Sequence, residues 1–386
     1  MSMKNYSRRS AYAFFIIMNF AVYGMNGIYY GFIQQYVSAY QTPVAAGYLL
    51  AVGPAVTVIA PFFWGWAADR ARFKNTVLAL AVAGGALTFC LLGVDHSFIY
   101  MFALLVAVMF FISPFGSLID TVSLEYSNEH DMSFGFMRVT GTVAFGVMTL
   151  IISLFYAQSE SSMFIGYVLL AAVGVCVTLF APRVQGHAQN REKYSLRPIF
   201  ADKKLMGYFF VIGISQFAWM CYLNNEPAYI TDTLGLPQWV WGLNVAVTVL
   251  GEVPFFFLFK RIFTRFGSKK IFAAAAALTA VRYVALAAAS STPAILATAL
   301  LTGFSPTVLM YVAASHINEN LPAELRASGQ NVMYALTFGI PRIIGGIFGG
   351  YAYELVGTAW MFVFCAVVCA LSAAVYFIRD ARRAGA

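Results

Sequence analysis

Six charged residues lie inside long apolar stretches of this chain, and three of them are acids and three are bases. They are Asp120, Arg138, Glu226, Glu252, Arg282 and Arg342. Since a charge is costly in hydrocarbon, such residues pair with one another or face a water-filled space, and they mark sites of solute binding or proton transfer. Asp120 and Arg138 lie at similar depths of neighbouring apolar segments, so we expect them to form an ion pair. A purely structural ion pair is the alternative.

Amides and phenols follow one another at helical spacing in the first apolar segment. Asn19, Tyr23, Asn26 and Tyr30 recur at intervals that place them on one helix face, and Gln34 continues the row. Because unsatisfied polar groups are costly in lipid, this face is expected to line a watery cavity and to contact a bound solute. Hydrogen bonding between helices is the alternative.

The seventh apolar segment carries a second polar group, made up of Gln216, Trp219, Asn225 and Glu226. Amide and carboxylate groups bind the hydroxyls of a polar solute by hydrogen bonds, and an aromatic face can stack on a sugar ring. These residues are therefore candidate substrate ligands.

Proton coupling requires an acid that binds and releases a proton, and a base that approaches the acid in only one state. Glu252 is the first candidate for the acid, because it lies near the middle of its apolar segment with an apolar flank. Glu226 competes for the role, and Arg282 or Arg342 is the expected partner.

The composition of the chain places these polar residues in a membrane protein. Of its 386 residues, 61% are hydrophobic and only 10% are charged, so the bilayer must be the solvent for most of the surface. Backbone groups find no water partners in lipid, and apolar segments of this length must therefore be helices. The formal net charge of +8 does not indicate nucleic-acid binding, because the bases are not gathered into one basic domain.

The sequence offers no pattern for an enzyme or a metal site. All five cysteines fall inside apolar segments, and we expect small buried hydrophobic residues there, not a disulfide framework or metal ligands. There is no phosphate-binding loop, Ser–His–Asp pattern or nucleotide-binding module. The chain is therefore expected to be no enzyme and to need no cofactor. No cleavable signal peptide is expected either.

Hydropathy predicts about twelve membrane helices, each near the ~20 residues that a bilayer requires. The predicted segments are 11–37, 43–68, 74–93, 97–123, 134–157, 161–181, 205–231, 237–259, 270–290, 293–317, 328–352 and 356–378. The polar connector 182–204 separates an N-terminal six-helix bundle (1–181) from a C-terminal six-helix bundle (205–386). The predicted fold class is thus all-α, with two bundles in the membrane.

The two halves resemble each other in sequence. Asn19-Phe20-Ala21 is echoed by Gln216-Phe217-Ala218, and Ser113-Pro114 is echoed by Ser305-Pro306. Each offset is about 190 to 200 residues, as duplication of a six-helix unit would give. Such repeats predict two pseudo-symmetric bundles with a substrate site near the middle of the membrane.

The stretch Gly65-Trp66-Ala67-Ala68-Asp69-Arg70-Ala71-Arg72-Phe73-Lys74 places one acid and three bases between two apolar segments. It is expected to form a short, water-facing turn in which Gly65 permits close helix approach and Asp69 caps or pairs with a neighbouring helix end. The stretch resembles the G-x-x-x-D-R-x-x-x-[RK] loop after the second helix of major facilitator superfamily transporters. This resemblance implies the major facilitator fold and a role in conformational gating for Gly65, Asp69, Arg70 and Lys74.

Two further motifs resemble the fourth and fifth helices of the lactose permease and phenylpropionate permease group. They are Asp120-Thr121-Val122-Ser123-Leu124 and Phe134-Gly135-Phe136-Met137-Arg138-Val139-Thr140-Gly141-Thr142. In the lactose permease an acid–arginine pair across these two helices holds the sugar, so the resemblance implies a sugar-binding role for Asp120 and Arg138.

The resemblance to the same group also extends to two residues of the second half. Arg282 matches a ninth-helix arginine that helps with proton coupling, and Glu252 matches an eighth-helix glutamate. The tenth helix departs from the group, because Ala299, Thr302 and Ser305 stand near the positions of a Lys, a His and a Glu. This departure argues against a lactose-type proton relay.

The predicted function is secondary active transport by alternating access, as proton-coupled uptake of a small polar organic solute. A sugar or glycoside is favoured over a nucleoside or an aromatic acid. Proton-driven efflux of drugs or sugars is the first alternative, and a receptor or scaffold is disfavoured because it would leave six buried charges without a role. The expected partners are the solute, protons and the lipid bilayer, and the chain is expected to be a monomer.

Lysine and arginine are confined to alternate connections between the predicted helices. Those around 38–42, 95–96, 158–160, 232–236, 290–292 and 354–357 contain neither residue. Because positive charge marks cytoplasmic loops, both termini and the connector 182–204 are expected in the cytoplasm and the protein in the inner membrane.

This topology predicts the labelling of single cysteines in a background without the five native ones. Cysteines placed at Ser38 or Ser290 should react with an impermeant maleimide in intact cells, whereas a cysteine at Arg197 should react only after the cells are opened. Labelling of the Arg197 position in intact cells would contradict the whole arrangement.

Overall fold

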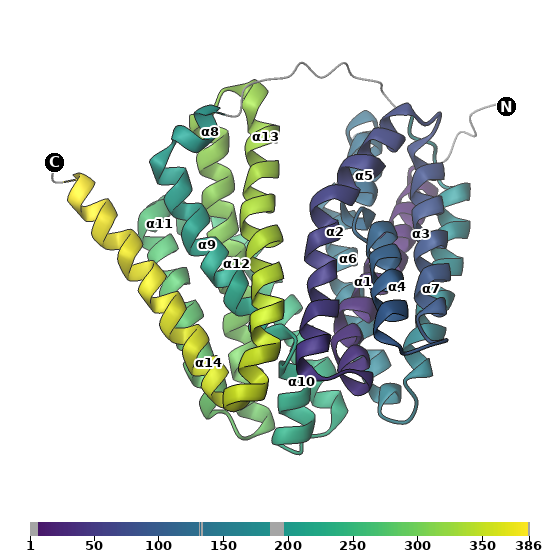
Figure 1. Ribbon diagram of the computed structural model, residues 1–386. Coiled ribbons are helices and arrows are strands. Elements are labelled where there is room, and N and C mark those ends of the chain that lie inside the picture. The colour runs from purple at the N-terminus through teal and green to yellow at the C-terminus, as the bar shows by residue number, and fades with distance from the viewer. Residues whose placement is uncertain (1–6, 131, 133, 186–196, 385–386) are drawn as a thin grey trace. The chain divides into compact units, whose positions relative to one another are not determined.

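A computed structural model describes residues 7–384 apart from 131, 133 and 186–196, and its regular structure in these residues is helical throughout (Figure 1). Within the helices, the side chains of several stretches lie outside this description. They are residues 128, 252–261, 302–307, 318, 323–324, 326–328, 331 and 379–384.

The first half of the chain forms seven helices. They are α1 (Arg8–Tyr40), α2 (Pro43–Arg70), α3 (Lys74–Leu91), α4 (Phe98–Ile112), α5 (Phe115–Glu129), α6 (Phe134–Tyr156) and α7 (Ser161–Phe180). The sequence predicts one segment over 97–123, where the structure has α4 and α5 with a break at Ser113–Pro114. Proline has no backbone N–H to donate and clashes with the preceding turn, so the helix is interrupted there.

The second half contains two short π-helical segments among its α-helices. Its elements are α8 (Arg197–Ala201), α9 (Lys203–Leu223), α10 (Glu226–Ala228), η1 (Tyr229–Thr233), α11 (Gln238–Ala288), α12 (Thr292–Asn320), α13 (Ala323–Tyr334), η2 (Ala335–Gly339) and α14 (Ile340–Ala384). The long α11 and α14 each turn at a glycine with a left-handed backbone, Gly267 (φ 75°) and Gly357 (φ 74°). Glycine adopts this conformation without a Cβ penalty, so each long element consists of two helices joined at a predicted loop.

Nine helices of the described residues are long and apolar enough to cross a membrane. One of them, Val332–Ile378, contains the turn at Gly357 and so holds two of the predicted segments. The two remaining predicted segments, 237–259 and 293–317, lie on the first part of α11 and on α12. The helices therefore correspond to the twelve segments predicted from hydropathy.

The chain groups into two compact units. Unit 1 comprises Met1–Tyr40, Val56–Arg191 and Trp241–Val249, and unit 2 comprises Gln41–Ala55, Glu192–Val240 and Leu250–Ala386. The helices α2 and α11 therefore each contribute residues to both units.

Unit 1 is built around α1, which packs along α5, α6 and α7. The Thr149 hydroxyl on α6 donates a hydrogen bond of 2.8 Å to the Gly27 carbonyl on α1. The Trp241 indole at the start of α11 donates one of 2.7 Å to the Gly31 carbonyl. These bonds to carbonyl oxygens hold α6 and the Trp241–Val249 segment against the central helix.

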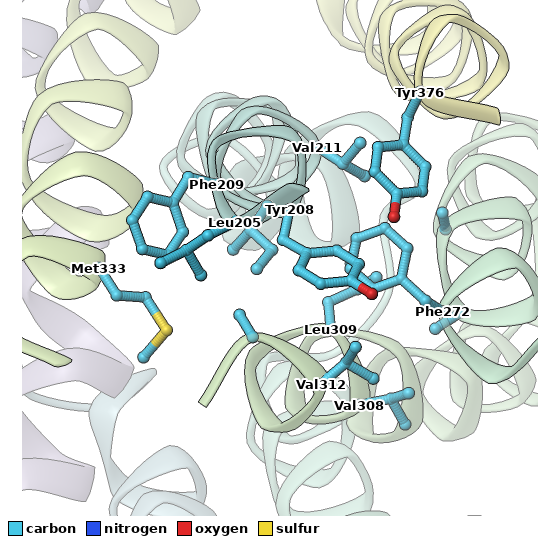
Figure 2. Packing of buried hydrophobic residues seen from close by; sticks show 14 of the residues in the cluster. Leu205, Tyr208, Phe209, Val211, Phe272, Val308, Leu309, Val312, Met333 and Tyr376 are labelled. Carbon is cyan, nitrogen blue, oxygen red and sulfur yellow. The ribbon is translucent and has the colours of Figure 1, made fainter. Parts of the chain in front are cut away.

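Unit 2 has an apolar cluster between α9, α12 and the second parts of α11 and α14. Figure 2 shows the rings of Tyr208, Phe272 and Tyr376 gathered there, with Val308, Leu309 and Val312 of α12 beside them. The centroid of the Tyr208 ring lies 4.8 Å from that of Phe272 and 5.6 Å from that of Tyr376. Aromatic pairs at such distances add to the stability that burial provides, so this cluster fixes α9 within unit 2.

The cysteines do not all take the buried positions expected of them. Cys221, Cys365 and Cys369 are buried, whereas Cys90 is half-buried and Cys176 is exposed, and all five are free thiols. Cys176 lies on α7, whose outward face is apolar, and in a bilayer lipid covers such a face.

A polar contact ties the start of α9 to α12 in unit 2. The Asp202 carboxylate caps α9, because its Oδ1 accepts the backbone N–H groups of Lys204 (2.9 Å) and Leu205 (3.0 Å). Its Oδ2 lies 2.8 Å from Nε2 of His316 on α12. Burial would raise the pKa of Asp202, but the hydrogen bonds from Leu205, His316 and Lys204 outweigh it and lower the pKa below 3.8.

This depressed pKa predicts a loss of stability in acid. A carboxyl whose pKa is lowered by folding stabilises the protein above its unfolded pKa, and that contribution disappears as the pH falls through the folded pKa. The melting temperature of the solubilised protein should therefore fall below about pH 4. Asp202→Asn should melt at a lower temperature at pH 7 and lose less on acidification, whereas Asp232→Asn, at an exposed acid, should behave as wild type. Parallel pH curves for Asp202→Asn and wild type would exclude this role.

Candidate functional site

Three polar residues of unit 1 meet at one carboxylate oxygen. The Tyr23 hydroxyl on α1 donates a hydrogen bond of 3.0 Å to Oδ1 of Asp120 on α5. Nε of Arg138 on α6 lies 3.3 Å from the same oxygen, and the Arg138 guanidinium carbon lies 4.2 Å from the centroid of the Tyr23 ring. The structure thus brings Asp120 and Arg138 together and adds Tyr23 to the pair.

The remaining polar atoms of this group are available to a solute. Side-chain exposures of 36% for Asp120 and 37% for Arg138 show that neither residue is sealed inside the helices. Within the described part of the chain, Oδ2 of Asp120 accepts no hydrogen bond, and Arg138 donates one of 3.3 Å from Nη1 to Thr142. A solute hydroxyl can therefore donate to Oδ2 while a second solute oxygen accepts from the guanidinium.

The other members of the polar row on α1 lie in different surroundings. Asn19 is fully buried, and its amide donates to the Ser123 hydroxyl (3.2 Å) and to the Phe15 carbonyl (2.9 Å). This fits the alternative of hydrogen bonding between helices. The Asn26 and Gln34 side-chain oxygens are buried and accept no hydrogen bond from the described residues. Tyr30 is half-buried, and its ring meets that of Tyr29 edge to face.

In unit 2, Gln216 on α9 holds Arg342 on α14. The Gln216 carbonyl oxygen accepts from Nε of Arg342 at 2.9 Å and from Nη2 at 2.6 Å. The guanidinium carbon also lies 4.3 Å from the centroid of the Phe338 ring. The amide oxygen satisfies two donors of Arg342 and leaves its charge intact.

Arg282, on the second part of α11, is almost fully buried among aromatic rings. Its guanidinium carbon lies 4.1 Å from the Tyr222 ring centroid, 5.3 Å from that of Tyr283 and 5.8 Å from that of Trp219. Its Nε is buried and forms no hydrogen bond within the described residues. The buried acid Glu226 is near enough to act on it electrostatically. The Arg282 guanidinium is thus stabilised mainly by cation–π contact with the faces of these aromatic rings.

Asn225 and Glu252 are two further candidates of unit 2. The Asn225 amide donates 2.9 Å to the Cys221 carbonyl and lies 3.7 Å from the Met361 sulfur, so it helps to close the end of α9. The side chain of Glu252 lies outside the described residues, so its role in proton coupling stays a prediction. No group of three or more His, Cys, Asp or Glu side chains among the described residues is arranged to hold a metal ion.

The stretch from Gly65 to Lys74 differs from the expected water-facing turn. Lys74 is the first residue of α3, is only 3% exposed and forms an ion pair with Glu125 of α5. Arg70 stacks over the exposed Trp66 ring at 4.4 Å. A Cβ built at Gly65 would meet no described atom within 4 Å, so the close helix approach expected there is absent from this part of the structure. Asp69 is half-buried.

The burial of Lys74 has a visible cause in the segment that follows α7. The Lys74 N–H donates 2.9 Å to the Val184 carbonyl, and the Asn75 amide donates to the Thr178 and Pro182 carbonyls. The Val184 N–H returns a hydrogen bond of 3.0 Å to the Asn75 side-chain oxygen. These bonds fold the chain after α7 over the start of α3 and remove Lys74 from water.

Three of these contacts were not predicted from the sequence. Thr142 stands one helical turn after Arg138, a spacing that brings side chains into contact. Glu125 follows Asp120 by five residues, and nothing in that spacing indicates Lys74 as its partner. Tyr222 lies among the polar residues of the seventh segment, but its ring face against Arg282 depends on how α9 and α11 pack.

Comparisons with known sequences point to one family. A family model described as the MFS_1 like family matches residues 12–364. The chain is 24% identical to the maltose permease of Geobacillus stearothermophilus over 341 residues, which cover 84% of this chain and 83% of that protein. It is 21% identical to the uncharacterized transporter YwbF of Bacillus subtilis (strain 168) over 333 residues, covering 84% and 80%.

Solved structures share the fold at low sequence identity. The nucleoside transporter NupG matches with a TM-score of 0.82 and 19% identity, covering 95% of this chain and 98% of that one, and a variant of it reaches 0.86. A bacterial homologue of the human lysosomal transporter Spinster, inward-facing and unoccupied, matches with a TM-score of 0.72, 13% identity and 96% coverage of each chain. The predicted all-α transporter fold is confirmed.

The contact between Asp120 and Arg138 predicts coupled effects of their substitution. Asp120→Asn or Arg138→Gln alone leaves a half-buried charge uncompensated and should largely abolish transport and lower the melting temperature. The double variant should recover the melting temperature, though not necessarily transport, with a coupling free energy of about 1 kcal/mol. The control cycle, Asp95→Asn with Arg70→Gln, should be additive. Additive losses for Asp120 and Arg138 would mean that the pair contributes nothing.

Proposed function

Since the chain belongs to the MFS_1 like family and is a secondary transporter of the membrane, we propose that it takes up a small polyhydroxylated solute together with protons. A sugar or glycoside is the favoured class. The solute would bind the Asp120–Arg138 group in alternating-access transport across the inner membrane, with both termini in the cytoplasm.

The half-exposed Asp120–Arg138 pair is the observation that carries the proposal. A carboxylate oxygen that accepts no hydrogen bond from the described residues lies beside a guanidinium with donors to spare. This combination binds a hydroxylated solute through one acceptor and one set of donors. The likeness to a maltose permease over most of both chains supports the sugar class.

Proton coupling is assigned to the acids of the second half. Glu252 is the first candidate and Glu226 the second, with Arg282 or Arg342 as the base that favours release of the proton. The burial of Glu226 and its electrostatic contact with Arg282 support a coupled acid–base group in unit 2. The Arg282 guanidinium contacts aromatic rings and that of Arg342 donates to the Gln216 amide oxygen, and both arginines lie in the same unit as Glu226 and Glu252.

Substrate class and direction can be tested on the purified protein. A melting-temperature panel with maltose, uridine and phenylpropionate should show stabilisation by a sugar, since a ligand at about 100 times its Kd adds about 2.7 kcal/mol. In proteoliposomes, an inward proton gradient should drive accumulation of the stabilising solute. Stabilisation by uridine alone would indicate a nucleoside as the substrate, and stabilisation by phenylpropionate alone would indicate an aromatic acid. Extrusion of the solute under the opposite gradient would support efflux.

Glu252→Gln tests the coupling assignment. Glutamine cannot release a proton, so the variant should retain solute binding and exchange between equal pools but lose accumulation against a gradient. Glu354→Gln, at an exposed acid of the same unit, should retain both activities. If Glu252→Gln still concentrates the solute under a proton gradient, the proton is carried elsewhere and Glu226 becomes the first candidate.

A further inference from the structure

Tyr23 contacts both members of the Asp120–Arg138 pair through two different parts of its side chain. Its hydroxyl donates to Oδ1 of Asp120 at 3.0 Å, and its ring lies 4.2 Å from the Arg138 guanidinium carbon. The residue is only 8% exposed, and the hydroxyl proton is already donated to the carboxylate. Tyr23 is therefore placed to act on a solute through Asp120 and Arg138, without donating to the solute itself.

The ring of Tyr23 is held in a slot on α6. A Cβ built at Gly141 would lie 2.8 Å from Cγ of Tyr23 and closer still to Cδ2, so the ring occupies the space that a side chain at position 141 would need. Gly141 follows Arg138 by three residues, which places both on one helix face. One turn of α6 thus supplies both Gly141, which leaves space for the Tyr23 ring, and Arg138, whose guanidinium lies against that ring.

These contacts direct the two charged groups. The Tyr23 hydroxyl and Nε of Arg138 both contact Oδ1 of Asp120. The other oxygen, Oδ2, accepts no hydrogen bond from the described residues. The flat Tyr23 ring against the Arg138 guanidinium restricts the tilt of the guanidinium. The Thr142 hydroxyl also accepts a hydrogen bond of 3.3 Å from Nη1 of Arg138. The free carboxylate oxygen and the free guanidinium donors are therefore held at fixed orientation before a solute arrives.

We propose that Tyr23, seated in the slot of Gly141, is a positioning residue that sets the orientation of Asp120 and Arg138 for solute recognition. The proposal rests on the proposed function for the identity of the recognised solute. The slot at Gly141 and the two contacts of Tyr23 do not depend on the proposed function. They are therefore tested separately from the recognition of a solute.

The slot is tested without any solute by a pair of substitutions. Gly141→Ala forces a methyl group into the ring and should lower the melting temperature of the full-length protein. Adding Tyr23→Ala removes the ring and should restore most of that loss. Gly174→Ala, where the nearest atoms are at 3.5 Å, is the matched control and should change little. If Tyr23→Ala fails to relieve Gly141→Ala, the slot is not occupied by Tyr23.

The hold on Arg138 is tested by its reactivity. Phenylglyoxal modification of Arg138, followed by mass spectrometry, should be about fivefold or more faster in Tyr23→Leu, because the cation–π contact is lost. Tyr23→Phe keeps the ring and should raise the rate much less. Arg70, which stacks on Trp66 in the same unit, is the internal control and should be unaffected. Equal Arg138 rates in wild type and Tyr23→Leu would overturn the proposal, whatever the solute proves to be.

The effect on recognition is tested by uptake kinetics with maltose or uridine, whichever the wild type transports. Tyr23→Phe loses one hydrogen bond to a carboxylate and should raise KM about fivefold to tenfold with little change in the maximal rate. Tyr29→Phe, on the same helix and away from Asp120, should keep the wild-type KM. A lower maximal rate at unchanged KM would instead make Tyr23 a purely structural residue.

Discussion

Hydrocarbon offers no hydrogen-bond partner to a polar group, and this constraint explains both the architecture and the sites of the chain. Backbone groups are satisfied inside helices, so the described residues form helices that meet at short turns. Side chains must be satisfied as well, and the charged ones are found where another group of the same unit can compensate them. Under the proposed function, a solute or a proton completes this compensation at the candidate sites.

Three buried or half-buried arginines show three kinds of compensation. Arg138 meets a carboxylate, Arg342 meets an amide oxygen and Arg282 meets aromatic faces. A carboxylate cancels the charge, an amide satisfies donors without cancelling it, and rings stabilise the cation through their quadrupoles. The three arginines thus keep their charge in largely apolar surroundings by three different kinds of contact.

The sequence was sufficient for features that depend on a single helix or on composition. Hydropathy predicts the helices because each apolar segment spans a bilayer by itself, and the approximate depth of Asp120 and Arg138 follows from counting residues. Features that depend on packing were not predictable in the same way. Lys74 becomes buried only because Asn75 binds the segment after α7, and Tyr23 reaches Asp120 only because Gly141 leaves room for its ring. A spacing shows which face a side chain occupies, but not what the opposing helix presents to it.

The helices α2 and α11 each pass from one compact unit to the other, and the local sequence eases bending near these points. In α2 the change occurs between Ala55 and Val56, one residue after Pro54, which has no N–H to complete the helix hydrogen bonds. In α11 it occurs between Val249 and Leu250, one residue before Gly251, and glycine is among the weakest helix formers. A bend is least costly where the helix is already weakened. Each helix nevertheless continues through its weakened point without a break, and the Trp241–Gly31 hydrogen bond fixes the start of α11 in unit 1.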